Sequence, residues 1–187
     1  GGVFVSNVTL HNEDEIKRKD IRLGDTVVIE RAGDVIPHIN KVIIEKRKFG
    51  SKEFLISNLC PSCNSITTKN KNESIRRCNN SFKCKSQLIE RLIHFCSKNA
   101  FNIEGLGEKQ IKIFFELGFL KTFSDIFLLE NYKDKIIKID RFGETSLRKL
   151  FTSINKSKSI TFDRFIYSLG IKQIGDTTAK LIADHYK

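Results

Sequence analysis

Four cysteines with the spacing of metal ligands are the residues of this chain whose chemistry is clearest. Cys60, Cys63, Cys78 and Cys84 form the pattern C-x2-C-x14-C-x5-C. Two close pairs separated by a loop can meet at one tetrahedral zinc ion, and four thiolates close its coordination shell to water. A closed shell holds a protein together and leaves no position for a substrate, so we expect a structural Zn2+.

The fifth cysteine and the missing leader sequence indicate a reducing compartment. Cys96 follows Leu92 and Phe95 in a helical stretch, and we interpret it as a small core residue, because an apolar setting does not activate a thiol. An odd cysteine count favours a reduced metal site over a disulfide framework. The chain has no methionine and no run of about 18 apolar residues. We therefore expect an internal piece of a longer cytoplasmic protein, with no membrane span.

Positive charge gathers around the cysteines. The chain has a net charge of +11, and residues 58–100 carry eight Lys/Arg against two Asp/Glu. Arg76 and Arg77, in the loop between the cysteine pairs, are candidate nucleic-acid contacts. Such a basic cluster favours a polyanionic partner. The alternative is a lysine-rich protein whose charged faces are only solvated.

Residues 1–56 are expected to form part of a small β-barrel. Short apolar runs separated by glycine turns predict strands, and the polar stretch 13–19 predicts a short helix. The apolar runs are 2–5, 8–10, 26–30, 35–39 and 41–45. These are too few to close a Greek-key barrel, so the sequence predicts at least one further strand upstream.

The rest of the chain divides into a cysteine module and a helical domain. Residues 57–86 have little hydrophobic drive, so zinc must supply their order. From residue 87 onward the pattern is helical, and the apolar positions between Gln87 and Lys98 lie on one helical stripe. The predicted fold is multi-domain, β followed by α.

A unit of apolar residue, glycine and acid occurs three times in the helical domain. Its glycines are Gly107, Gly143 and Gly175, 36 and then 32 residues apart, and an amphipathic helix follows each. The pattern predicts helix, tight hairpin, helix, three times. The first amides of such a helix lack internal partners and its dipole favours an anion, so each unit offers a phosphate site that reads no base. Alternatively, these glycines are ordinary helix-start turns.

The first unit is the fullest, and each unit carries a cation. Gly105 adds a second glycine, through which the backbone can approach a ligand closely. Lys112, Arg148 and Lys180 stand five residues after the repeat glycines, in one register. They are candidates to flank the backbone of a duplex. The alternative is that helix surfaces are generally rich in lysine.

Three groups of motifs follow one another in a specific order. They are Val8-Thr9-Leu10-His11-Asn12, residues 20–25 and residues 31–37; then the four cysteines; then Arg91-Leu92-Ile93-His94-Phe95, residues 103–107, residues 168–171 and Gly175. In these motifs the chain resembles the bacterial NAD-dependent DNA ligases. The groups are similar to that family's OB-fold signature, its zinc finger and its helix-hairpin-helix region, and together they cover essentially the whole chain.

The resemblance implies an activity whose reactive residues lie elsewhere. In this family the lysine of a K-x-D-G motif, in a separate adenylation domain, attacks NAD+. AMP then passes to the 5′-phosphate of a nick, and the 3′-hydroxyl displaces it. No K-x-D-G motif occurs in this chain. We therefore expect no catalytic residue here, an NAD+ site and Mg2+ ligands in the missing domain, and no activity of this piece alone.

The resemblance also implies the domain boundaries and the partner. It assigns residues 1–56 to an OB-fold without its first strand, 57–86 to a four-cysteine zinc finger, and 87–187 to an incomplete helix-hairpin-helix domain. A fourth hairpin and a BRCT domain would follow. The expected partner is nicked double-stranded DNA, clamped by a monomer in the bacterial cytoplasm, at the nucleoid, during replication and repair.

Within the barrel segment, Arg22 and Arg31 are the cations expected on DNA. The alternative for both is surface pairing with Asp20 and Asp25. His11 and Asn12 either touch DNA or the adenylation domain, or cap a turn. For His94 we favour a satisfied core histidine over a functional one.

Two other classes of function stay open. A stand-alone zinc and helix-hairpin-helix module could recruit other proteins to DNA, and the absent catalytic motif favours it if the chain is complete. A zinc ribbon that binds RNA is the third possibility. The hairpin repeats argue against it, because such repeats more commonly track duplex phosphates.

Overall fold

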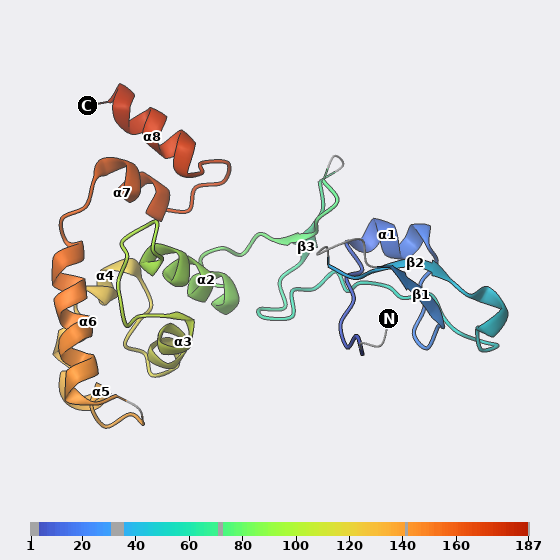
Figure 1. Ribbon diagram of the computed structural model, residues 1–187, viewed down its shortest axis with the longest axis horizontal. Coiled ribbons are helices and arrows are strands. Elements are labelled where there is room, and N and C mark those ends of the chain that lie inside the picture. The colour runs from blue at the N-terminus through green and yellow to red at the C-terminus, as the bar shows by residue number, and fades with distance from the viewer. Residues whose placement is uncertain (1–3, 31–35, 71–72, 141, 187) are drawn as a thin grey trace. The chain divides into compact units, whose positions relative to one another are not determined.

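The strands and most of the helices lie in different parts of the chain. The computed structural model describes residues 4–30, 36–70, 73–140 and 142–186 (Figure 1). Residue contacts divide the chain into an N-terminal unit, Gly1–Asn80, and a C-terminal unit, Ser81–Lys187. The four described strands lie in the first unit, and every described α-helix except the first lies in the second. The boundary falls inside the expected cysteine module, so the division into three domains stays a prediction.

The N-terminal unit contains two small antiparallel sheets. Strands β1 (Val27–Glu30) and β2 (His38–Val42) pair, with a bulge between Val28 and Ile29. Strands β3 (Thr67–Thr68) and β4 (Arg77–Cys78) form the second sheet. Among the described residues no barrel is closed.

The expected strands agree with these sheets only in part. The strand expected at 26–30 is confirmed as β1. The one expected at 41–45 is wrong beyond Val42, because a 3-10 helix, η1 (Ile44–Lys46), follows. Of residues 8–10, only Thr9 forms a bridge, to His38. Half of the run 2–5 lies outside the described residues, and the other half, Phe4 and Val5, is in no strand.

The expected short helix at 13–19 is confirmed as α1 (Glu13–Arg18). It begins where the Asn12 side-chain oxygen accepts hydrogen bonds from the Asp14 and Glu15 amides, both at 3.0 Å. Acidic residues fill its first turn and basic residues its last, as the helix dipole favours. Asn12 therefore caps a helix, which the sequence analysis gave as the alternative to a contact with DNA or the adenylation domain.

Few apolar side chains are buried in the N-terminal unit. Ile16 and Ile39 are buried, whereas Phe4, Leu23 and Phe49 are each at least 80% exposed. Apolar burial therefore contributes little to the stability of this unit.

An ionic cluster holds part of the unit together. Arg47 pairs with Asp20 and with Asp25, the latter through Nε and Oδ1 at 2.9 Å. Arg22 donates from Nε to Asp20 at 2.9 Å and from its amide to Asp25 at 2.8 Å. Hydrogen bonds from Arg22, which contributes most, and from Arg47 lower the pKa of Asp20 from its ordinary 3.8 to about 2. The cluster joins the turn at residues 20–25 to the segment that carries Arg47.

The C-terminal unit consists of helices joined by short turns. Its helices include α2 (Lys85–Cys96), α3 (Glu108–Glu116) and α6 (Glu144–Ser157). The other elements are α4 (Phe123–Ile126), η2 (Leu129–Tyr132), α5 (Lys133–Ile136), α7 (Phe162–Ser168) and α8 (Asp176–His185). None of the helices in the described ranges has the length and apolar character needed to cross a membrane.

One apolar core joins most of these helices. Leu92 of α2, Phe114 of α3 and Leu147 of α6 are almost completely buried in it. The Phe95 ring stacks on Phe101, with centroids 4.0 Å apart. A second, smaller cluster lies between α7 and α8, which are neighbours at the C-terminal end of the chain (Figure 1).

Two side chains fasten α7 to the residues around α2. His94 Nε2 lies 2.8 Å from the carbonyl oxygen of Tyr167. Arg164 donates from Nε to the Ala100 carbonyl at 2.8 Å and from Nη2 to the Lys98 carbonyl at 2.7 Å. His94 is thus a hydrogen-bonded histidine within the packed unit, as the sequence analysis favoured.

Acid is expected to destabilise the N-terminal unit between about pH 4 and about pH 2. Ionised Asp20 stabilises the fold because its pKa is about 2 in the cluster and 3.8 ordinarily, and this contribution is lost as the pH falls through that interval. Arg47→Gln should weaken the dependence. The measurement is urea unfolding at several pH values, followed through the amide NMR signals of β1 and β2. Lys46→Gln, at the exposed neighbouring position, is the control; the same pH dependence in both variants would contradict the role of the cluster.

Candidate metal centre and nucleic-acid interface

The four cysteines with metal-ligand spacing come together in space. The sulfur atoms of Cys60, Cys63, Cys78 and Cys84 all lie within 4.8 Å of one another. A tetrahedral ion with Zn–S bonds of about 2.3 Å holds its sulfurs about 3.8 Å apart. The Cys63 and Cys78 sulfurs are 3.6 Å apart, too far for a disulfide and close to the metal-bound spacing. The donor set can hold a metal ion, and four thiolates are a set that zinc prefers.

Short backbone elements place each sulfur. A tight turn brings Cys63 back toward Cys60, since the Asn64 amide donates to the Cys60 carbonyl at 2.8 Å and the Cys60 amide to the Ser65 carbonyl at 2.9 Å. Cys78 lies in β4, paired with Thr67 of β3. Cys84 is the N-cap residue of α2, where the helix dipole favours a thiolate.

The thiols differ in acidity. Hydrogen bonds with Ser65 lower the pKa of Cys63 to about 6. A backbone hydrogen bond with Asn80 favours the thiolate of Cys78, but burial and the neighbouring Cys63 and Cys60 raise its pKa to about 11. Cys63 is therefore a stronger acid than Cys78, and a bound cation would displace the protons that the thiols hold.

Cys96 has a different environment. It is buried in the apolar core of the C-terminal unit, and this burial raises the pKa of its thiol to about 12. The interpretation of Cys96 as a core residue agrees with this position.

Each repeat glycine is the residue directly before a helix. Gly107, Gly143 and Gly175 are the N-caps of α3, α6 and α8, all with extended backbone and no side-chain cap. Gly105 differs, because its φ of +86° lies in the left-handed region that favours glycine. The three helices thus present their first amides next to residues without a side chain, which leaves these amides accessible to an anion.

The cations in register after these glycines are not equally available. Lys112 pairs with Glu108, and Lys180 pairs with Asp176 at 3.1 Å, each within its own helix. In the described part of the chain Arg148 has no ion pair. A phosphate would meet a free guanidinium on α6 and would have to compete with a carboxylate on α3 and α8.

The arginines expected on DNA in the N-terminal unit are also paired. Arg22 pairs with Asp20 at 2.9 Å, Arg76 with Glu13 at 3.0 Å and Arg77 with Glu73 at 3.5 Å. The surface-pairing alternative for Arg22 is therefore what the structure contains. Arg31 was also expected to contact DNA, and it lies outside the described residues. The DNA roles of all four arginines stay predictions.

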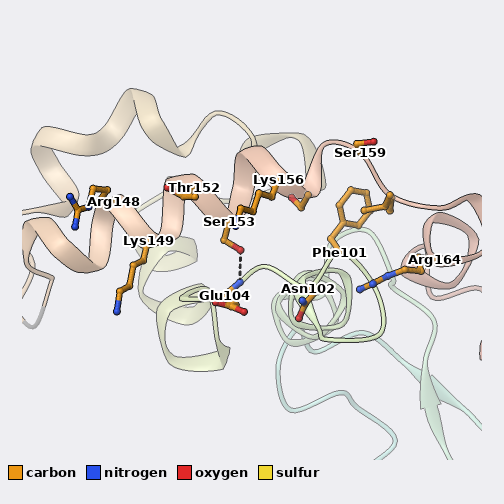
Figure 2. A pocket seen from close by; sticks show the side chains of 12 residues that line it. Phe101, Asn102, Glu104, Arg148, Lys149, Thr152, Ser153, Lys156, Ser159 and Arg164 are labelled. Atoms are coloured by element: carbon orange, nitrogen blue, oxygen red, sulfur yellow. Dashed lines mark hydrogen bonds between the residues drawn. The ribbon is translucent and has the colours of Figure 1, made fainter.

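Two lysines that the sequence analysis did not single out lie on the same helix as Arg148. Lys149 and Lys156 line a groove of about 550 Å³ along α6 (Figure 2). Arg148, Thr152 and Lys156 are spaced i, i+4, i+8, which places them on one stripe of a helix. This spacing is visible in the sequence. The opposite wall of the groove is not, because residues about fifty positions earlier form it.

Comparison with known proteins confirms the family resemblance. Residues 1–51 match the model of the NAD-dependent DNA ligase OB-fold domain. The chain is 52% identical to the DNA ligase of Pelagibacter ubique (strain HTCC1062), 50% to that of Wolbachia pipientis wMel and 48% to that of Acidiphilium cryptum (strain JF-5). Each alignment covers 100% of this chain but only 27% or 28% of the relative.

Residues 1–51 therefore belong to an OB-fold domain. Along its whole length the chain is similar to proteins named DNA ligase, and it spans little more than a quarter of the length of the curated relatives it matches.

Zinc binding is expected to depend on the cluster and not on the fifth cysteine. Chain purified in the presence of zinc should hold one Zn2+ per molecule, and Cys78→Ser should lose most of it and loosen residues 57–86, because three thiolates no longer close the shell. Elemental analysis measures the metal, and limited proteolysis measures the loosening. Cys96→Ala should retain the metal; retention in Cys78→Ser, or loss in Cys96→Ala alone, would show that the ligands are assigned wrongly.

Proposed function

We propose that this chain is the DNA-binding part of an NAD-dependent DNA ligase, which seals nicks between a 5′-phosphate and a 3′-hydroxyl during replication and repair. The observation that carries the proposal is the similarity to DNA ligases along the whole chain, at about half of all positions. The chain contributes binding, and NAD+ and Mg2+ act in an adenylation domain. The absence of a K-x-D-G motif supports this division.

Each part of the chain has a proposed role in holding the duplex. Residues 1–56 form the OB-fold that lies against the minor groove. Residues 57–86 form the zinc finger, which positions the segments on either side of it. Residues 87–187 form a helix-hairpin-helix domain that holds the backbone near the nick. The OB-fold match, the four-cysteine cluster and the helices that begin after repeated glycines support these roles in turn.

The proposed contacts are to the sugar-phosphate backbone. Amides at the start of α3, α6 and α8 donate to phosphate oxygens, and the cations near them add charge attraction. Such contacts position a protein on DNA without reading its sequence, as a ligase that acts at any nick requires. The net charge of +11 favours the same partner.

The state and place of action belong to the same proposal. We infer that the ligase acts as a monomer, because one molecule clamps one nick. We also infer that it acts in the bacterial cytoplasm, at the nucleoid. The five cysteines form no disulfide with one another, and four of them lie in a metal-ligand cluster, which supports a reducing compartment.

The test is binding of the zinc-loaded chain to a nicked duplex and to the same duplex without a nick, by fluorescence anisotropy over a range of salt concentrations. We expect binding that weakens steeply with salt, since each phosphate contact releases counterions. Preference for the nicked duplex would support a clamp that senses the nick, and equal binding would place nick recognition in the adenylation domain. Absence of binding to either duplex by a chain that contains zinc and is helical would contradict the proposal.

A second prediction ranks the hairpins. Gly107→Val should weaken duplex binding more than Gly143→Val, because the turn before α3 has the second glycine, Gly105, and brings more backbone to the phosphate. A Cβ at Gly143 would meet no neighbouring atom within 4 Å, and one at Gly107 would meet only the Gln110 side chain at 3.4 Å. Both variants should therefore fold, which circular dichroism checks. The reverse order of affinities would show that the ranking is wrong.

A further inference from the structure

The groove along α6 has two walls that are fixed to each other. One wall is α6 itself, and the other is the loop from Phe101 to Glu104 (Figure 2). The Glu104 amide donates to Ser153 Oγ of α6 at 2.8 Å and joins the walls directly. At one end lies Arg164, which is held by the carbonyl groups of Ala100 and Lys98. The groove is therefore a formed feature of the C-terminal unit.

The groove collects positive charge that carboxylates do not neutralise. Its lining includes Arg148, Lys149, Lys156 and Arg164, against one acidic residue, Glu104. Within the described ranges, Arg148, Lys149 and Lys156 form no ion pair, in contrast to Lys112 and Lys180 on the other repeat helices. A concave surface with several unpaired cations concentrates anions more strongly than scattered surface lysines do.

The spacing of the cations fits an extended polyanion. Arg148 and Lys156 are eight residues apart on α6, a rise of about 12 Å at about 1.5 Å per residue. One strand of a duplex advances about 3.4 Å along the axis per phosphate and winds round the axis as it does so, and a row of this length can therefore face more than one phosphate. The Thr152 hydroxyl lies on the same stripe and adds a hydrogen-bond donor between the charges. A small anion would occupy only one end of such a row.

We propose that this groove binds the phosphodiester backbone of a nucleic-acid strand, as a contact surface in addition to the helix-start amides. Lys149, Lys156 and Arg148 neutralise successive phosphates, and Thr152 donates to a phosphate oxygen between them. The proposal rests on the proposed function and extends it, because it adds a second track for the backbone on the same helical unit.

The test compares two double variants of the full chain with equal loss of charge. Lys149→Gln/Lys156→Gln changes the groove, and Lys121→Gln/Lys138→Gln changes two exposed lysines of the same unit outside it. The groove variant should bind duplex DNA roughly tenfold more weakly at low salt, and the slope of log affinity against log salt should fall by about two. The control should change the slope by clearly less. Lys149→Arg/Lys156→Arg should bind like the unaltered chain.

Each other outcome overturns a defined statement. If the unaltered chain binds duplex and the groove and control variants bind equally, the groove proposal is wrong and the proposed function stands. If NMR titration with inorganic phosphate shifts the groove residues while duplex affinity is insensitive to Lys149 and Lys156, the site is one for small anions. If the unaltered chain binds no duplex, the proposed function fails and the groove proposal fails with it.

Discussion

The meeting of four thiols at one point is the constraint on which the segment from Cys60 to Cys84 depends. This segment has almost no other source of order: its two strands are two residues each, and Ile66, Ile75 and Phe82 are more than half exposed. Without a core, the conformational entropy of the segment has no compensation from apolar burial. A cation bound by the four cysteines would supply the missing free energy by fixing four side chains. The C-terminal unit is ordered differently, by a continuous apolar core.

A count of charges along the sequence does not say which charges a partner can reach. The region around the cysteines is the most basic per residue, yet Lys69 and Arg76 both pair with Glu13 of α1, at 3.1 and 3.0 Å. These contacts lower the pKa of the Glu13 carboxyl, and the hydrogen bond from Arg76 contributes most to the shift. The acid therefore stays ionised and holds the cations. On α6, by contrast, the cations of the groove have no such partner among the described residues. Part of the positive charge that the sequence count places around the cysteines is therefore already paired within the protein.

The features that the sequence predicted are those set by local spacing. The capped helix α1 and the glycine that precedes each of α3, α6 and α8 follow from residues a few positions apart, and the cysteine cluster follows from two close pairs of one ligand type; the structure contains all of them. The strands were predicted less well, because a strand needs a partner that the sequence does not name: the segment 8–10 has suitable residues but pairs only at Thr9. The groove was missed for the same reason, since Glu104 and Ser153 meet across 49 positions.

The repeat glycines show how a structure separates the needs of folding from those of binding. Gly105 is required by the fold itself, because its φ of +86° strains any residue with a side chain. Gly143 and Gly175 have extended backbone that any residue adopts, and an added Cβ at either would meet no atom of the described chain within 4 Å. Packing of the described residues therefore does not require glycine before these helices. The proposed phosphate contact would use the open space, because a residue without a side chain leaves the first amides accessible to an anion.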